Sequence, residues 1–253
     1  MRKTKKPINT MRFVTAVMNI LTNMIVSTNV STALNTTDGS GAMTKTRANV
    51  SISARIARRS DKMAIKPILF NTEMVQAILD GRKTCTRRIV KGAIPDDAMW
   101  GYTMFTPKGC ISCRGVYADG YGEGFYKLPY QPGDILYVRE TWCKGSWMNE
   151  KERYYYKADD NDFHCVWHPS IHMPKEAARI WLMVTDVRVE RLQDMTDDDA
   201  EAEGCFDYTS TALGFPDVWD STIKKSDLDR YSWQANPWVW VIEFERCEKP
   251  KEG

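Results

Sequence analysis

The sequence has little net charge and few histidines, and it lacks an apolar segment that could cross a membrane. Its 253 residues carry a net charge of +2 and only three histidines. The longest moderately apolar stretch runs from Arg12 to Val30, but Asn19, Thr22 and Asn23 interrupt it, which makes it a poor membrane span. No internal repeat, phosphate-binding loop, Ser-His-Asp order or pair of glycosidase acids stands out. We therefore expect an ordinary globular protein that does not bind a membrane.

The charge is unevenly distributed along the chain. Residues 1–62 carry eleven Lys or Arg against two acids, whereas the remaining residues carry 24 basic side chains against 31 acidic ones. All nine tryptophans and all seven cysteines also lie after residue 62. The two parts are therefore different kinds of polypeptide. The slight negative charge of the second part argues against a large surface for non-specific duplex binding, because such a surface needs many cations.

Residues 1–62 are rich in Thr, Asn, Ser and Ala, and Phe13 is their only aromatic residue. Such a segment buries too little apolar surface to offset chain entropy, so we expect it to be mostly disordered, with a short amphipathic helix in its apolar part. Basic residues ahead of that part give it a faint likeness to a signal peptide. Alternatively, translation begins at Met63 and the segment is an over-extended gene model.

The seven cysteines form an odd set without regular spacing, which favours reduced thiols and a cytoplasmic protein. Cys110 and Cys113, with Cys165 and His168, have the residue types of a zinc site. The gap between the two pairs is long, however, and the chain after Cys113 continues as a strand pattern. The expectation is therefore isolated thiols, with no metal and no cofactor.

The body of the chain, residues 63–253, contains more strand patterns than helix patterns. One helix is expected from Asn71 to Asp80, capped by Asn71 or Thr72 and ended by Gly81. Another is expected from Thr196 to Glu203, capped by Thr196 and ended by Gly204. Residues 205–235 read as irregular, with a short helix near 226–231. Because the helices are short and do not alternate with strands as βαβ units, the pattern predicts an α+β fold built on a mostly antiparallel β-barrel. The expected strands cover residues 67–70, 84–90, 102–105, 111–116, 124–128, 135–142, 153–158, 178–189 and 238–244.

The most unusual stretch runs from Gly81 to Arg88 and places one lysine, two threonines, one thiol and three arginines in eight residues. It follows the first expected helix and continues as an extended segment, in which alternate side chains share a face. Thr86 and Arg88 should then share one face. Cys85 and Arg87 should face the other way, away from any pocket that the first two line.

This stretch resembles the signature of the ASCH domain, a PUA-like β-barrel, in which a Gly-x-Lys-x-x-Glu/Thr-x-Arg pattern follows a short helix. Gly81, Lys83, Thr86 and Arg88 fill the pattern. Residues 167–174 and 236–240 are similar to a larger variant of the family that is common in phages and prophages. The resemblance covers roughly residues 65–247. Further similarities are the Pro-Gly-Asp turn at 132–134, the helix at 200–204 and the closing strand at 241–244.

The resemblance implies a protein that recognises a nucleobase, either in a free nucleoside or in RNA. One small branch of the family removes the acetyl group from N4-acetylcytidine with a Lys, a Thr and a Glu. By motif position these residues correspond to Lys83, Thr86 and Glu203. Long insertions at about 92–130 and 205–235 depart from that branch and could reshape or cover its pocket.

The chemistry implied for this set is hydrolysis of an acylated cytidine amide. A Thr hydroxyl becomes a nucleophile when a base removes its proton, and a lysine is such a base only when it is neutral. Glu203 would orient the lysine or carry a proton to the leaving amine. An arginine that faces the pocket would stabilise the oxyanion or hold the substrate carbonyl.

The predicted substrate-binding side chains are Arg88, Arg139, Trp142 and His172. Trp142 would stack on a base, and His172 would reach the pocket from a loop. A core role for Trp142 and a structural loop role for His172 remain as alternatives. Two other functions also remain open: a non-catalytic RNA- or nucleotide-binding module of phage origin, and a phage protein that acts through protein–protein contacts.

Overall fold

The computed structural model describes residues 50–51, 63–146, 151–159, 165–205 and 214–250. The chain divides into two units, and all described residues belong to the second, residues 47–253. The expected disorder and amphipathic helix of residues 1–62 lie outside the described residues, apart from Val50–Ser51, which form a short strand. Among the described helices, none is long and apolar enough to cross a membrane.

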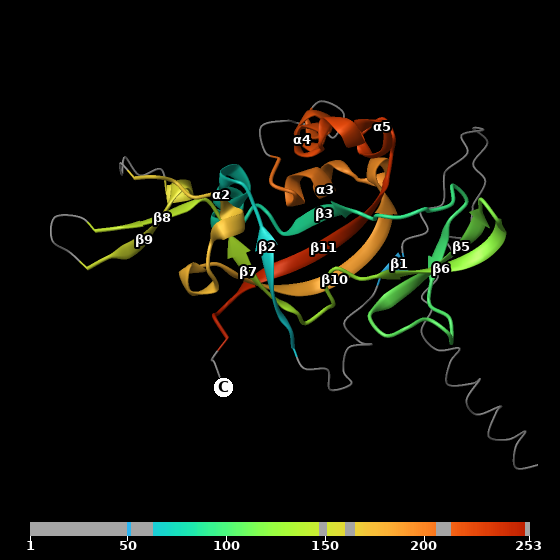
Figure 1. Ribbon diagram of the computed structural model, residues 1–253, viewed down its shortest axis with the longest axis horizontal. Coiled ribbons are helices and arrows are strands. Elements are labelled where there is room, and N and C mark those ends of the chain that lie inside the picture. The colour runs from blue at the N-terminus through green and yellow to red at the C-terminus, as the bar shows by residue number, and fades with distance from the viewer. Residues whose placement is uncertain (1–49, 52–62, 147–150, 160–164, 206–213, 251–253) are drawn as a thin grey trace, which may run out of the picture. The chain divides into compact units, whose positions relative to one another are not determined.

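A six-stranded sheet forms the centre of the second unit (Figure 1). The hydrogen-bonded order is β2–β7–β10–β11–β3, and β1 pairs with β10. β2 and β7 pair in parallel, whereas every other pairing in the described sheets is antiparallel. The fold is therefore α+β with mostly antiparallel sheets, as predicted. The strands are β1 (Val50–Ser51), β2 (Ile65–Leu69), β3 (Cys85–Ile89), β7 (Ile135–Arg139), β10 (Trp181–Arg191) and β11 (Trp238–Cys247).

Two smaller sheets are formed by the segments that flank β7. Strands β4 (Met99–Gly101), β5 (Cys110–Tyr117) and β6 (Gly120–Lys127) form one, and β8 (Trp142–Gly145) and β9 (Arg153–Tyr156) form the other.

The strand expected at 102–105 instead lies at β4. Its Trp100 packs edge-on against Tyr126 and Trp238, with ring centroids 5.1 and 5.6 Å apart, so burial of this indole positions the strand. The single strand expected at 135–142 is split into β7 and β8. The split occurs at Glu140, whose buried carboxylate binds Arg179 through both oxygens.

The helix ends follow the sequence signals closely. The Asn71 side chain accepts a hydrogen bond from the backbone N–H of Met74, and Thr196 and Asp199 form a reciprocal capping box. Gly204 ends its helix in the left-handed region, at φ 89°. The helices are α2 (Thr72–Leu79), α3 (Asp197–Ala202), α4 (Phe215–Thr222) and α5 (Leu228–Tyr231). Short 3₁₀ helices cover Lys157–Asp159, Ser170–His172, Lys175–Ala177, Leu192–Asp194 and Lys225–Asp227.

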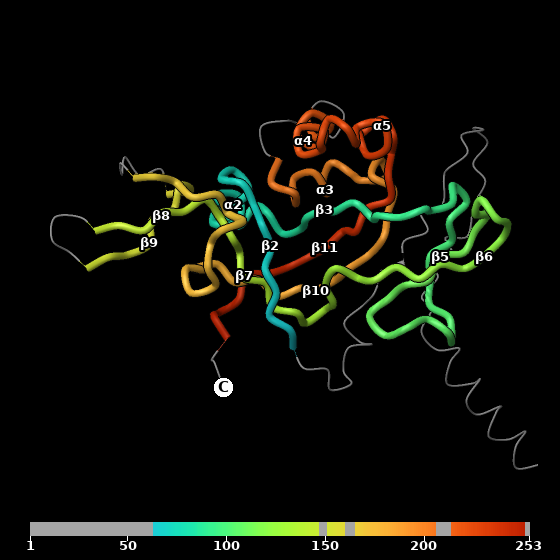
Figure 2. Tube along the Cα trace, viewed as in Figure 1, coloured from blue at the N-terminus to red at the C-terminus, as the bar shows by residue number. Residues whose placement is uncertain are grey.

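The long strand β11 is buried on both faces. Trp240 and Ile242 belong to the main core, together with residues of β2, β7, β10 and α2. Val241 on the opposite face packs in a second cluster with Phe215 and Trp219 of α4. Figure 2 traces β10 and β11 side by side, with α3, α4 and α5 gathered on the side of β3. Two-sided burial explains why β11 reads as a continuous apolar run.

The central sheet is open, and the expected closed barrel is therefore wrong. β2 and β3 are the two ends of the order, and no strand pairing joins them in the described chain. Side chains satisfy the outer carbonyls of β2 instead. Leu69 O accepts from Arg88 Nη2 at 3.2 Å, and Pro67 O accepts from the Tyr130 hydroxyl at 2.9 Å. Pro67 also has no N–H to offer another strand on that edge.

We expect Gly204→Ala to destabilise the fold more than Gly81→Ala. Both glycines have a positive φ, of 89° and 77°, so alanine is strained at either position by about 1 kcal/mol. An added Cβ at Gly204 would also lie 2.8 Å from Ala77 Cβ, whereas nothing lies within 4 Å at Gly81. Urea denaturation measures the difference, and equal losses for the two variants would contradict this packing argument.

Candidate functional site

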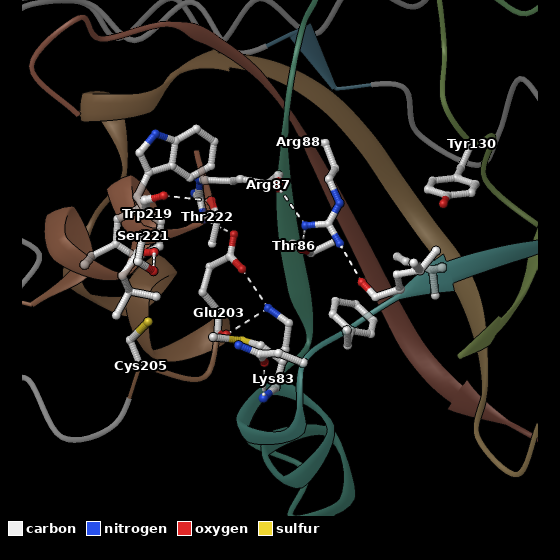
Figure 3. Close-up of a pocket in the computed structure, with 17 residues that line it drawn as sticks. Lys83, Thr86, Arg87, Arg88, Tyr130, Glu203, Cys205, Trp219, Ser221 and Thr222 are labelled. Atoms are coloured by element: carbon white, nitrogen blue, oxygen red, sulfur yellow. Dashed lines mark hydrogen bonds and ion pairs between the residues drawn. The ribbon is translucent and has the colours of Figure 1, made fainter. Parts of the chain in front are cut away.

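A pocket with a volume of about 470 Å³ lies between β2, β3, α2, the end of α3 and α4. Its volume is in the range of pockets that bind small molecules. The three predicted catalytic residues, Lys83, Thr86 and Glu203, all line it (Figure 3). The pocket adjoins the two unpaired sheet edges, since Leu69 of β2 and Arg88 of β3 also contribute to its wall.

Lys83 and Glu203 form a buried ion pair in this wall. Lys83 Nζ donates to Glu203 Oε2 at 2.7 Å and to the Glu203 backbone carbonyl at 2.8 Å. The two side chains are 1% and 8% exposed. Nζ also lies 5.5 Å from the ring centroid of Phe70. The proximity expected between these two residues is therefore observed, while their catalytic roles remain a prediction.

The ends of two helices bring this pair together across 120 residues of sequence. The chain leaves α2 at Gly81, and the backbone N–H of Lys83 donates to Ala77 O at 3.0 Å. Glu203 follows the last residue of α3. The backbone N–H of Thr84, the residue after Lys83, donates to Ala202 O at 2.9 Å. Backbone hydrogen bonds thus dock the end of α3 onto the segment that leads into β3.

Thr86 and Arg88 lie on one face of β3, as the strand alternation predicts. Arg88 Nη1 donates to Thr86 Oγ1 at 3.0 Å, and the Arg88 guanidinium lies 5.5 Å from the Phe70 ring centroid. The Thr86 hydroxyl therefore accepts one hydrogen bond and keeps its own proton to donate. Within the described chain, no hydrogen bond joins Thr86 to Lys83 or Glu203.

Arg87 lines the same pocket, which corrects the expectation that it faces elsewhere. Its Nη1 lies 3.4 Å from Glu203 Oε1, and its Nη2 lies 3.4 Å from Asp199 Oδ1 and 3.7 Å from Glu190 Oε2. Burial opposes the guanidinium charge, but the carboxylates, Glu203 foremost, outweigh it and raise the pKa of Arg87. Strand alternation places Arg87 opposite Thr86, but it does not reveal that α3 covers that second face.

Cys85 shares the Arg87 face but does not line the pocket. Arg87 Nη1 lies 3.8 Å from its sulfur. Burial first, and then the negative charge of Glu203, raise the pKa of the Cys85 thiol to about 12. The sulfur is therefore a neutral, unreactive group at ordinary pH.

Three of the four predicted substrate-binding residues lie away from this pocket. Arg139 Nε donates to the backbone carbonyl of Met173 at 2.7 Å. Trp142 packs against Tyr154 and against His168, with ring centroids 5.7 and 5.1 Å apart. His172 is exposed in a short 3₁₀ helix. Only Arg88 of the four lines the pocket.

Helix α4 supplies a wall of the pocket that the sequence did not predict. Phe215, Val218 and Trp219 line it from the segment 205–235, which was expected to be irregular apart from a short helix. The available signals were the i, i+4 spacing of Phe215 and Trp219 and the proline at position 216, where proline favours a helix start. Tyr130 on the opposite side had no recognisable signal.

The expectation of isolated thiols is wrong for Cys143 and Cys165, which form a disulfide. The partner of Cys165 is therefore Cys143, which is not among the four zinc ligands considered from the sequence. Among the described residues, no group of three or more His, Cys, Asp or Glu side chains is arranged to hold a metal. The described free cysteines are Cys85, Cys110, Cys113, Cys205 and Cys247.

Comparisons with known proteins do not extend this picture. A scan against protein-family models finds no match, and neither the curated proteins nor the solved structures contain a match to the chain. Function is therefore argued from the geometry and chemistry of the pocket.

We expect Arg87→Met to lower the free energy of unfolding by about 3 kcal/mol, because it removes a buried cation from among three carboxylates. This expected loss is at the lower end of the range for a broken buried ion pair. Arg188 also contacts Glu190 and Asp199, so two of the three carboxylates keep a cation after the substitution. Arg82→Met is the control, because Arg82 is partly exposed and pairs with exposed Asp80. Urea denaturation tests both, and a loss below about 1 kcal/mol for Arg87→Met would contradict the role given to it.

We expect iodoacetamide at pH 8.5 to modify partly exposed Cys110 while buried Cys85 in the folded chain remains unmodified. The raised pKa of Cys85 also has a consequence for stability. Only the unfolded thiol ionises between its ordinary pKa of 9.0 and about 12, so the free energy of unfolding falls as pH rises through that range. Peptide mass spectrometry measures the labelling, and equal rates for the two thiols would refute the burial argument.

Proposed function

We propose that the chain is an ASCH-like protein of the PUA type, whose pocket binds a nucleoside and hydrolyses the amide of an N4-acylated cytidine. One observation carries the proposal: Lys83, Thr86 and Glu203 line a single pocket although Glu203 comes 120 residues after Lys83. The resemblance of the Gly81 to Arg88 stretch suggests the reaction, and the pocket provides a place for it.

The side chains that line the pocket support this proposal, because they are of the kinds that recognise a base. Arg88 offers a planar guanidinium with several N–H donors beside the Phe70 ring, and Tyr130 contributes a second aromatic ring. Bases are commonly stacked on aromatic rings or guanidinium planes and hydrogen-bonded at their edges. The carbonyl and ring nitrogen of a cytidine are acceptors, so they match Arg88 better than they match a carboxylate.

In this mechanism Lys83 first transfers a proton to Glu203, 2.7 Å away, and becomes a neutral amine. The amine removes the Thr86 proton, directly once substrate is bound or through one water, and Thr86 Oγ1 bonds to the amide carbon. Negative charge moves to the carbonyl oxygen, and the guanidinium of Arg88, 3.0 Å from Thr86 Oγ1, stabilises it.

Collapse of this intermediate breaks the C–N bond, and the Lys83 ammonium returns its proton to N4 of the leaving cytidine. Water then attacks the acyl ester on Thr86, with Lys83 accepting its proton. Lys83 passes this proton to Thr86 Oγ1 as the bond to the acyl carbon breaks, the carboxylic acid departs, and Glu203 returns to Lys83 the proton that it accepted in the first step. The net reaction consumes one water and yields cytidine and one carboxylic acid.

A non-catalytic binding module is the second candidate, and the ion pair favours it. Lys83 Nζ is engaged by both the carboxylate and the backbone carbonyl of Glu203, and Arg87 Nη1 donates to the other carboxylate oxygen. These contacts occupy Lys83 within the protein, and no hydrogen bond joins it to Thr86 in the described part of the chain. A pocket in this state binds a nucleotide or RNA without turning it over.

We expect the full chain to release cytidine from N4-acetylcytidine and Thr86→Val to reduce kcat about 100-fold or more, because the nucleophile is removed. Thr86→Val preserves side-chain shape and leaves the Lys83–Glu203 pair intact. Thr84→Val, two residues earlier and exposed outside the pocket, is the matched control and should retain activity. Chromatography of released cytidine measures the rates.

Glu203→Gln should likewise lose at least about 100-fold in kcat, whereas exposed Glu201→Gln should not. Circular dichroism checks that each variant is folded. Absence of turnover at high protein concentration, with salt-dependent RNA binding retained, would favour the binding module. Turnover that survives Thr86→Val would show that the nucleophile is assigned wrongly.

A further inference from the structure

We propose that α4 forms a subsite for the acyl group and that this subsite selects apolar acyl groups larger than acetyl. This inference rests on the proposed function, because it names the substrate class of the same pocket. It concerns the wall supplied by Phe215, Val218 and Trp219.

The pocket has two unlike sides, with the ion pair between them. Figure 3 shows Thr86, Arg88 and Tyr130 on one side of Lys83 and Glu203, and Trp219 on the other. In an N4-acylated cytidine the scissile amide lies between the base and the acyl group. When that amide sits beside Lys83 and Thr86, the base and the acyl group must therefore occupy opposite sides.

Three side chains on the α4 side carry an N–H or O–H donor, and each of these donors is already used within the protein. Trp219 Nε1 donates to Tyr231 O at 2.8 Å. Ser221 Oγ donates to Val218 O at 2.7 Å, and Thr222 Oγ1 donates to Trp219 O at 2.7 Å. Since these donors are used within the protein, the wall offers a ligand the carbon of Phe215, Val218 and Trp219, the sulfur of Cys205, and two hydroxyl oxygens that act only as acceptors.

This wall is also firmly held. Phe215 and Trp219 are 4% and 7% exposed and pack with Val241 of β11 in the second core cluster. Half-buried Val218 borders the same cluster and lines the pocket. An apolar surface of this kind is complementary to a hydrocarbon group.

The opposite side suits the nucleoside. It contains the Arg88 guanidinium and the Thr86 hydroxyl, which can pair with the polar edge of a base. The carbonyl and ring-nitrogen acceptors of a base placed against α4 would lose their hydrogen bonds to water without replacement, and this costs free energy. The chemistry of the two sides therefore fixes the orientation, with the acyl group towards α4.

Binding of two non-hydrolysable ligands tests the subsite without requiring turnover. N4-benzylcytidine and N4-methylcytidine lack the carbonyl, so calorimetry with the full chain measures affinity alone. We expect the benzyl compound to bind about tenfold tighter or more, because additional apolar groups in a hydrophobic pocket each contribute a factor of this order.

Two substitutions at Val218 should remove that preference. Val218→Phe fills the subsite, and Val218→Thr keeps the side-chain shape but adds a hydroxyl. Val116→Phe is the control, since Val116 is 59% exposed on β5 and does not line the pocket. The control should retain the full preference for the benzyl compound.

Parallel rates with N4-acetylcytidine and N4-benzoylcytidine separate this inference from the proposed reaction. A benzyl preference lost in both Val218 variants supports the subsite even when neither amide is hydrolysed, and the hydrolase proposal alone then fails. Turnover without any preference between the two acyl groups, or a preference that Val218→Phe leaves intact, overturns the subsite while the hydrolase stands. If neither N4-benzylcytidine nor N4-methylcytidine binds, both proposals fail.

Discussion

The pocket depends on one carboxylate that serves two buried cations. Glu203 Oε2 accepts from Lys83 at 2.7 Å, and its Oε1 faces Arg87 at 3.4 Å. A buried cation that loses its partner costs several kcal/mol, so this carboxylate holds the segment after α2, strand β3 and the end of α3 in one arrangement. The same contacts place charged groups next to two apolar cores, where they interact more strongly than they would in water.

The open edge of the sheet creates the space that this carboxylate faces. Closure of β2 onto β3 would join the edges by backbone hydrogen bonds, but Pro67 has no N–H to contribute and Arg88 bonds to Leu69 O instead. A single guanidinium thus bridges the two edges and also touches Thr86. The site and the departure from a barrel therefore have one cause, the replacement of strand pairing by side-chain contacts.

Local signals predicted much of the fold and part of the site. The caps at Asn71 and Thr196 and the glycine after α3 are observed as expected. The strand alternation that puts Thr86 and Arg88 on one face of β3 is also observed. These features depend on residues a few positions apart, which is why they can be read from sequence. The spatial proximity of Lys83 and Glu203 came from a motif resemblance, because no local rule links residues 120 apart.

The sequence by itself determined the α+β class, the helix ends and the polar composition of the Gly81 to Arg88 stretch, since propensity, capping and strand period act locally. The tertiary structure alone decided that the sheet stays open, that Arg87 faces the pocket and that α4 forms its apolar wall. Each of these outcomes depends on which distant element covers a given face. Alternation along β3 defines two faces, but only the packing of α3 and α4 against β11 decides which of them becomes a binding surface.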